Sequence, residues 1–312
     1  MTEVFEERTR RCQQRLRAVD ADGVVCFPST NLYYLSGFRE DPGERHLLLF
    51  VPAAGDPAFV APEMYDEQLA EESWVADVRT WSDGDEPLDL VRGVATDLDL
   101  DGGRLLLDDR MWTLFTQDLR AALPDAEFGL ASEVLDPLRM RKDDAEVEAL
   151  RRAGSVADDV SVAVRELGAD AVGMTEAELA REIESRLADA GGEEVAFETI
   201  VGAGPNGAKP HHGHGDRVIE PGDPVVLDFG AFVDGYPSDQ TRTVVFDGTP
   251  PEEFDRVHRA VREALQAGVE AVEPGVTAES VDRAAREVIE SYGYGDRFVH
   301  RTGHGVGLDV HE

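Results

Sequence analysis

The sequence has few cysteines and no long apolar run. Its only cysteines, Cys12 and Cys26, exclude a disulfide framework and a thiolate-rich zinc site. The N-terminus is charged throughout and lacks the apolar core of a signal peptide, and no later run approaches the length of a membrane span. We therefore expect a cytoplasmic protein that does not enter a membrane.

Positive charge is also scarce. The 312 residues include 65 acidic and 30 basic side chains, which gives a formal net charge of −35. Such a surface repels nucleic acid and anionic membranes, so neither is expected as a partner. Only Lys142 and Lys209 are lysines. An acidic, lysine-poor surface is typical of halophilic proteins, because concentrated salt screens the repulsion between its charges.

Several catalytic motifs are missing. The sequence has no P-loop, no H-E-x-x-H and no G-x-S-x-G, so serine nucleophile chemistry has no support. The segment Gly202–Gly207 matches the dinucleotide pattern G-x-G-x-x-G. That pattern requires a helix to start there, and Pro205, Pro210 and the glycines that follow exclude one.

The most informative stretch is Val225–Phe246, VVLDFGAFVDGYPSDQTRTVVF, which reads as a β-hairpin. Its two apolar runs flank Asp234-Gly235, a dipeptide that tolerates the positive φ angles of a two-residue turn. This turn predicts the cross-strand pairs Val233–Tyr236, Gly230–Asp239 and Asp228–Thr241. Asp228 and Asp239 are then diagonal neighbours on one face of the sheet.

Two neighbouring carboxylates repel each other unless a proton or a cation lies between them. Their diagonal spacing suits a pair of divalent ions about 3.5 to 4 Å apart. The alternative is a solvated hairpin in a very acidic protein. Because Asp228 lies inside the apolar run VVLDF, where a buried charge needs a partner, we favour a metal site.

The chain is expected to form two domains. In residues 1–137, apolar runs such as GVVCF, HLLLFV and RLLLD alternate with helical stretches, which predicts an α/β unit. Pro137 and the charged residues after it mark a junction, and a long helix begins at about Asp144. The second domain is predicted to span 138–312.

The second domain contains an internal repeat. Gly173-Met-Thr175 opens a helix that stops at Gly191, and Gly275-Val-Thr277 opens a similar one that stops at Gly293. Both pairs of positions differ by 102 residues. We expect two similar α+β halves around a pseudo-two-fold axis. The counterpart of the hairpin would begin after Glu312, so we also expect the 312-residue sequence to lack its last hairpin.

Histidines cluster in two glycine-rich stretches, PHHGHG and HRTGHGVGLDVHE. Among these, His304 is favoured as a metal ligand, because Gly303 and Gly305 let backbone and metal approach closely. A mononuclear site made by the histidines at 211, 212 and 214 is a weaker alternative, since adjacent side chains in an extended loop point apart.

With these residues in view, the sequence resembles the Xaa-Pro aminopeptidase and prolidase family of the pita-bread fold. The resemblance rests on LRMRKDDAEVEALRRA, GPNGAKPHHG, LDFGAFVDGYPSDQTRT and HRTGHGVGLDVHE. It implies a creatinase-type α/β N-terminal domain, followed by an α+β pita-bread metallopeptidase domain that is C-terminally incomplete.

The resemblance also implies a site. Two divalent ions, manganese or cobalt, would be held by Asp228, Asp239 and His304, together with two glutamates expected beyond Glu312. His211 and His311 would be catalytic, His211 by assisting proton transfer and His311 by steadying the tetrahedral intermediate. His300 would bind substrate at the scissile carbonyl.

The function implied is metal-dependent hydrolysis of the Xaa-Pro peptide bond by a dinuclear metal-activated water. The partners would be small peptides with proline at the second position, and we expect a homodimer. Two alternatives stay open: a creatinase-like amidinohydrolase, which needs no metal, and a non-catalytic peptide-binding member of the fold, suggested by the two absent glutamates.

Overall fold

The structure, a computed structural model, describes residues 2–312. The chain forms two compact units, Met1–Arg141 and Lys142–Glu312. Within the described residues, no helix is both long enough and apolar enough to cross a membrane.

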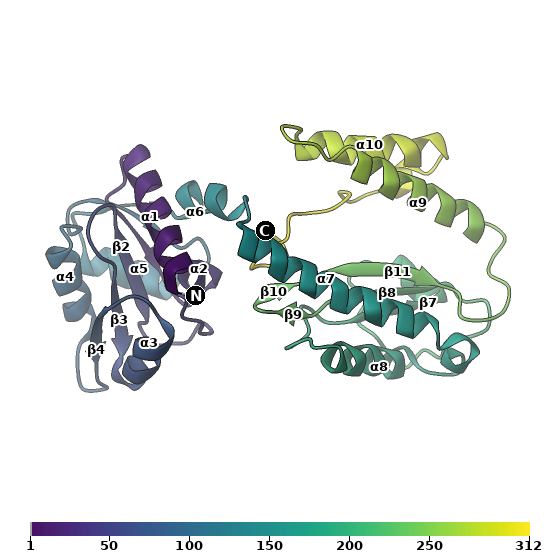
Figure 1. Cartoon of the computed structure of the whole chain (residues 1–312), viewed down its shortest axis with the longest axis horizontal. Coiled ribbons are helices and arrows are strands. Elements are labelled where there is room, and N and C mark those ends of the chain that lie inside the picture. Colours follow the sequence, from purple (N-terminus) through teal and green to yellow (C-terminus); the bar gives the residue numbers. More distant parts are fainter. Residues whose placement is uncertain (1) are drawn as a thin grey trace. The chain divides into compact units, whose positions relative to one another are not determined.

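The first unit is built on a six-stranded mixed sheet with the order β4-β3-β2-β1-β5-β6 (Figure 1). Strand β1 is antiparallel to β2 and parallel to β5. The strands are β1 (Gly23–Cys26), β2 (Leu48–Pro52), β3 (Ala58–Pro62), β4 (Asp77–Trp81), β5 (Arg104–Leu107) and β6 (Glu127–Leu130). The helices are α1 (Thr2–Ala18), α2 (Thr30–Ser36), α3 (Asp66–Glu72), α4 (Pro87–Asp97), α5 (Thr113–Ala122) and α6 (Ser132–Arg139).

Apolar side chains on both faces of the central strands hold this unit together. Phe50 of β2 and Leu105 of β5 are fully buried in one cluster with Val91 of α4 and Phe115 of α5. Full burial of one such side chain stabilises the fold by about 1.5 to 3 kcal/mol. The strands predicted from GVVCF, HLLLFV and RLLLD are confirmed.

The second unit places two helices against a small antiparallel sheet with the order β11-β8-β7. The strands are β7 (Ile200–Ala203), β8 (Val225–Phe229), β9 (Phe232–Val233), β10 (Tyr236–Pro237) and β11 (Gln240–Val244). The helices are α7 (Asp144–Arg165), α8 (Glu176–Asp189), α9 (Phe254–Glu270) and α10 (Ala278–Ser291). Leu227 and Phe229 of β8 are buried with Val160 of α7 and Ile183 of α8. Alternate residues of β8, among them Asp228, are therefore left to the opposite face.

The predicted hairpin register is confirmed. Thr241 pairs with Asp228, and Tyr236 pairs with Val233. Asp234 and Gly235 both have positive φ, 51° and 76°, as a two-residue hairpin turn requires. Helix α7 fixes the turn from outside: the Tyr236 hydroxyl donates to Glu146 at 3.0 Å, and Arg152 donates to Asp234 at 2.7 Å.

The internal repeat is confirmed for the second helix of each half. Helices α8 and α10 have 14 residues each, and their first residues, Glu176 and Ala278, differ by 102 positions. Thr175 and Thr277 cap them, and each side chain accepts a hydrogen bond from the third residue of its helix. The segments that follow differ, because Ile200–Ala203 forms β7 whereas Gly295–Arg297 forms a 3₁₀ turn and then a loop.

Helices α9 and α10 pack against each other through small residues. Ala264 of α9 and Ala285 of α10 are buried in one cluster with Ile289. On another side of α9, Leu265 and Val269 are 61% and 65% exposed. Within the described part of the chain, the packing of α9 therefore relies on α10.

The hairpin depends on a glycine where its strands come closest. A Cβ atom on Gly230 would lie 1.8 Å from the carbonyl oxygen of Ser238, so the backbone of the hairpin would have to shift to admit it. We predict that Gly230→Ala lowers the free energy of unfolding by roughly 2 to 3 kcal/mol, as overpacking does.

Gly154→Ala is the matched control, measured by the same chemical denaturation. Gly154 lies inside α7, and a Cβ there meets no described atom within 4 Å. Alanine should stabilise that helix by about 0.5 to 1 kcal/mol. Equal effects of the two substitutions would contradict the close approach at Gly230.

Candidate metal centre

Asp228 has one carboxylate oxygen without a partner. Its Oδ1 is buried and has no hydrogen-bond partner among the described residues. The pKa of Asp228 is raised above its ordinary value, mainly by burial. A hydrogen bond with Thr241 opposes this shift, and the carboxylate of Asp239 adds to it. The two carboxylates therefore lie close enough to repel each other, as their shared face predicts.

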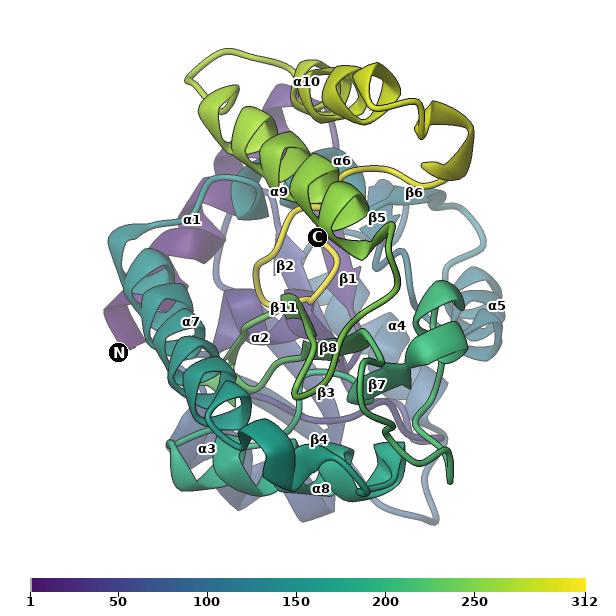
Figure 2. The same ribbon diagram turned by 90° about the vertical axis from the view of Figure 1, so that its right-hand side faces the viewer.

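Asp239, His304 and His311 form a group of potential ligands. One nitrogen or oxygen atom from each side chain lies within 4.8 Å of the other two. Nε2 of His304 is 3.3 Å from Oδ2 of Asp239, and the two side chains are 28% and 26% exposed. The chain after α10 returns as a loop toward β11, which brings His304 to the hairpin (Figure 2).

The orientation of the His304 ring suits ligation. Its Nδ1 lies 2.9 Å from the carbonyl oxygen of Gly305, so this nitrogen carries the proton and donates. In the neutral ring, Nε2 then presents a lone pair toward the Asp239 carboxylate. A lone pair facing a carboxylate needs a cation or a proton between them, and a backbone carbonyl that fixes the tautomer is typical of metal-binding histidines.

A tight turn carries His311 to this place. The backbone N–H of Glu312 donates to the carbonyl oxygen of Gly305 at 3.0 Å. A Cβ on Gly305 would lie 2.3 Å from the carbonyl oxygen of Glu312, so only glycine permits the closure. The rings of His304 and His311 consequently lie 3.8 Å apart, centroid to centroid.

The other two histidines selected from the sequence lie outside this group. The charge of His211 lowers the pKa of Asp228, so its ring lies within electrostatic reach of that carboxylate. His211 also has a positive φ of 54°, which is uncommon for a residue with a side chain. His300 is exposed, and its Nδ1 lies 2.9 Å from the carbonyl oxygen of Arg301.

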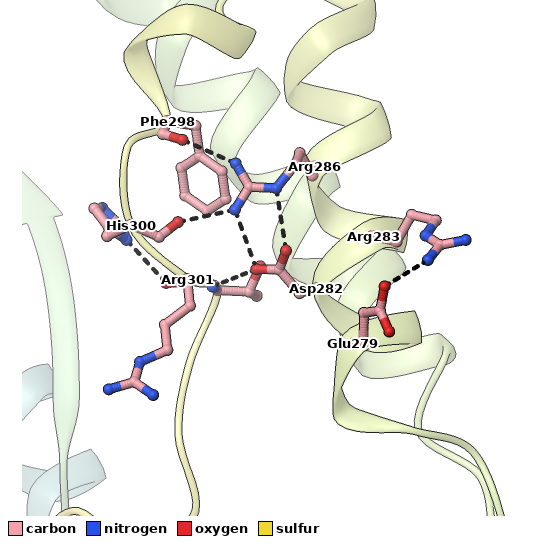
Figure 3. A network of polar contacts seen from close by, with 8 residues as sticks. Glu279, Asp282, Arg283, Arg286, Phe298, His300 and Arg301 are labelled. Atoms are coloured by element: carbon pink, nitrogen blue, oxygen red, sulfur yellow. Dashed lines mark hydrogen bonds and ion pairs between the residues drawn. The ribbon is translucent and has the colours of Figure 1, made fainter.

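An ion pair on α10 holds the segment that carries His300 and His304 (Figure 3). The Asp282 carboxylate accepts from the backbone N–H and the hydroxyl of Thr302 at 2.8 and 2.9 Å. Arg286 donates to Asp282 at 3.1 Å and to the carbonyl oxygens of Phe298 and His300 at 2.9 and 3.0 Å. Phe298, His300 and Thr302, which precede His304, are thus tied to one helix.

These supporting residues could not be identified from the sequence. Asp282 and Arg286 are four positions apart, which is also the spacing of an ordinary surface ion pair on a helix. Glu176 contacts His212 and lies in the first turn of α8. Acidic residues are common in that turn, and Glu178 in the same turn completes a capping box, so Glu176 does not stand out in the sequence. Bonds between residues far apart in the chain leave no periodic signal.

The residues present fit a divalent cation. A carboxylate oxygen of Asp239 and ring nitrogens of His304 and His311 converge. Asp228 is not part of this group, but its buried Oδ1 has no hydrogen-bond partner in the described structure. This donor set suits divalent ions such as manganese, cobalt and zinc.

Comparison with known proteins agrees with the fold and with an enzyme that uses metal ions. Residues 148–312 match metallopeptidase family M24, and residues 8–141 match the creatinase/prolidase N-terminal domain. The chain belongs to metallopeptidase family M24 and has the two-domain pita-bread architecture of prolidases. The family implies that the enzyme uses divalent metal ions.

Three relatives show how far the similarity extends. The chain is 41% identical to the "Probable dipeptidase PepE" of Mycobacterium bovis, over 99% of this chain and 82% of that protein. It is 34% identical to the "Xaa-Pro dipeptidase" of Lactobacillus helveticus, over 97% and 82% respectively. The crystal structure of a prolidase from Thermococcus sibiricus superposes with a TM-score of 0.92 at 37% identity, covering 99% of this chain and 83% of that one.

The network around Asp282 predicts a defined pH dependence. Hydrogen bonds from Arg286 and from Thr302 lower the pKa of Asp282 from 3.8 to about 2. The folded state thus binds fewer protons than the unfolded state between these values, and the stabilisation is present above pH 3.8 and lost as the pH falls to about 2. We predict that the difference in denaturation midpoint between the wild type and Asp282→Asn is constant near neutral pH and vanishes toward pH 2.

Glu279→Gln is the control, because Glu279 pairs with Arg283 at the same spacing on α10. This pair is exposed, and the contact joins two side chains of α10 and no loop (Figure 3). A similar acid-dependent difference for Glu279→Gln would argue against a special role of the Asp282 network.

Proposed function

We propose that this chain is a metal-dependent dipeptidase that hydrolyses the bond between an N-terminal residue and proline. The observation that carries the proposal is the convergence of Asp239, His304 and His311. Asp228 lies outside that group, but its carboxylate interacts electrostatically with Asp239 and His304, and its buried Oδ1 has no hydrogen-bond partner among the described residues. The dipeptidase and Xaa-Pro dipeptidase names of its relatives support the same substrate class.

We propose Asp228, Asp239 and His304 as ligands of two divalent ions, manganese or cobalt. When bound, these ions supply Lewis acidity and activate water near neutral pH. The hydrogen bond to Gly305 leaves Nε2 of His304 free to bind an ion, and this nitrogen already lies close to the Asp239 carboxylate.

The remaining histidines act on the substrate in this proposal. His211 donates a proton to the proline nitrogen as the peptide bond breaks, so that proline leaves as a neutral amine. His311 donates a hydrogen bond to the oxyanion of the tetrahedral intermediate, and His300 binds the substrate near the scissile carbonyl. The proline nitrogen of an Xaa-Pro bond carries no hydrogen, so recognition relies on the shape of the ring.

The alternatives have less support. A creatinase-like site without metal leaves the adjacent carboxylates of Asp228 and Asp239 uncompensated. A non-catalytic peptide-binding protein is not favoured, because the relatives are named as dipeptidases.

We also propose the domain limits 1–137 and 138–312, a cytoplasmic location and a homodimer. The two buried free thiols, Cys12 and Cys26, are consistent with a reducing compartment. Light scattering of the purified chain tests the proposed dimer.

Metal binding tests the ligand assignment directly. We predict that the dialysed protein binds manganese or cobalt in calorimetric titrations, and that Asp228→Asn or His304→Ala weakens binding by about tenfold to a hundredfold, because each change removes a donor. Asp223→Asn, a change in a residue paired with Arg217, is the control. Unchanged affinity in the first two variants would rule out these ligands.

Substrate choice tests the reaction. We predict that the metal-loaded enzyme releases proline from Ala-Pro and acts at least about tenfold more slowly on Ala-Ala, because the site selects the proline ring. A chelator should abolish the activity, and manganese or cobalt should restore it. Equal rates on the two dipeptides, or activity that survives chelation, would contradict the proposal.

A further inference from the structure

Glu176 is a carboxylate buried within the protein. It lies in the first turn of α8, and its side chain is 0% exposed. Its carboxylate accepts four hydrogen bonds from the segment between Ala203 and Gly215, which contains His211. This segment links β7 to the residues before β8 and is called the His211 loop below.

Each oxygen of Glu176 holds one end of the His211 loop. Oε1 accepts from the backbone N–H of Ala203 at 2.8 Å and from the side-chain amide of Asn206 at 2.9 Å. Oε2 accepts from Nε2 of His212 at 2.9 Å and from the backbone N–H of Gly215 at 3.2 Å. One side chain thus closes a loop whose ends are twelve residues apart, counted from Ala203 to Gly215.

The carboxylate remains charged despite its burial. Burial alone raises the pKa of Glu176, but the hydrogen bonds from His212, Ala203 and Asn206 outweigh it and leave the pKa below its usual value. Charge-assisted hydrogen bonds are about twice as strong as neutral ones, so four of them make a rigid anchor.

His211 lies between two residues that Glu176 holds, Asn206 and His212. Its left-handed backbone, with a φ of 54°, is unfavourable for a residue with a Cβ and persists only where the surroundings enforce it. The next residue, His212, is fixed by Glu176 on one side of the strained position. On the other side, Lys209 donates its backbone N–H to Asn206, which Glu176 also holds.

We propose that Glu176 is a positioning residue: by holding Asn206, His212 and Gly215 it imposes the strained backbone that presents the His211 ring to the metal centre. The inference rests on the role proposed for His211 and adds the residue that makes this role possible. The simpler alternative is that Glu176 satisfies buried donors and stabilises the fold without affecting His211.

Glu176→Gln separates these two explanations, because it keeps the shape and removes the charge. The amide oxygen should face Ala203 and Asn206, which can only donate in these bonds, whereas the amide nitrogen then opposes the N–H of Gly215. We predict that amide hydrogen exchange speeds up at least about tenfold at Gly215 and changes little at Ala203. His212 should also move its proton from Nε2 to Nδ1, visible in imidazole ¹⁵N spectra.

Glu178→Gln is the matched control. Glu178 lies in the same turn, and its carboxylate accepts from the backbone N–H and the hydroxyl of Thr175 at 2.8 and 3.1 Å. Glutamine is also accepted in a capping box, so exchange at Gly215 should not change. His212→Asn is a second variant, which leaves the Glu176 carboxylate with its other donors. It should also speed up amide hydrogen exchange at Gly215.

The catalytic consequence is a loss of turnover without a loss of metal. For Glu176→Gln we predict that kcat on Ala-Pro falls about tenfold to a hundredfold, as expected when a reacting group is displaced, while manganese affinity stays as in the wild type. A freed loop with unchanged kcat and unchanged His211 resonances would overturn the proposal, and so would unchanged exchange at Gly215.

The test does not depend on the proposed reaction. If the wild type does not hydrolyse Ala-Pro, the proposed function fails, but the exchange rates and the His211 resonances still report whether Glu176 positions the ring. Shifted His211 resonances in Glu176→Gln, and unshifted ones in Glu178→Gln, would then support the positioning role alone.

Discussion

The register of one β-hairpin determines where the candidate metal centre can form. Asp228 and Asp239 share a face only because Asp228 pairs with Thr241, and a slip of one residue would turn one carboxylate to the opposite face. The turn at Asp234 and the close approach at Gly230 both fix this register. The histidine loops contribute to the site only if the hairpin has already placed its carboxylates.

Each half of the repeat then supplies a histidine loop held by an acidic side chain of its second helix. In the first half Glu176 of α8 binds the His211 loop, and in the second half Asp282 of α10 binds the segment before His304. The two acids do not occupy equivalent positions, since the repeat aligns Glu176 with Ala278. In both halves an acidic side chain of the second helix therefore holds a loop, but the acid comes from a different position of the repeat.

Local chemistry explains which features could be predicted from the sequence. The Asp234-Gly235 turn fixes the hairpin, and Thr175 and Thr277 mark the helix starts, because turns and caps depend on a few neighbouring residues. The pairing of Glu176 with His212 and the approach of His311 to His304 could not be predicted, because these contacts depend on the path of loops in space. A strand also needs a partner strand, and the segment 297–303, which follows α10, has none in the described residues and forms no strand.

The two anchors differ in their contact with the surrounding solution. Asp282 and Arg286 keep 28% and 32% of their side chains exposed, whereas Glu176 is fully enclosed. Mobile counter-ions reach the first pair and compete for its charges, since the screening length shrinks from about 10 Å at 0.1 M ionic strength to about 3 Å at 1 M. As ionic strength rises, the segment before His304 should therefore loosen while the His211 loop keeps its shape, so that the two sides of the centre respond unequally to the ionic environment of the cell.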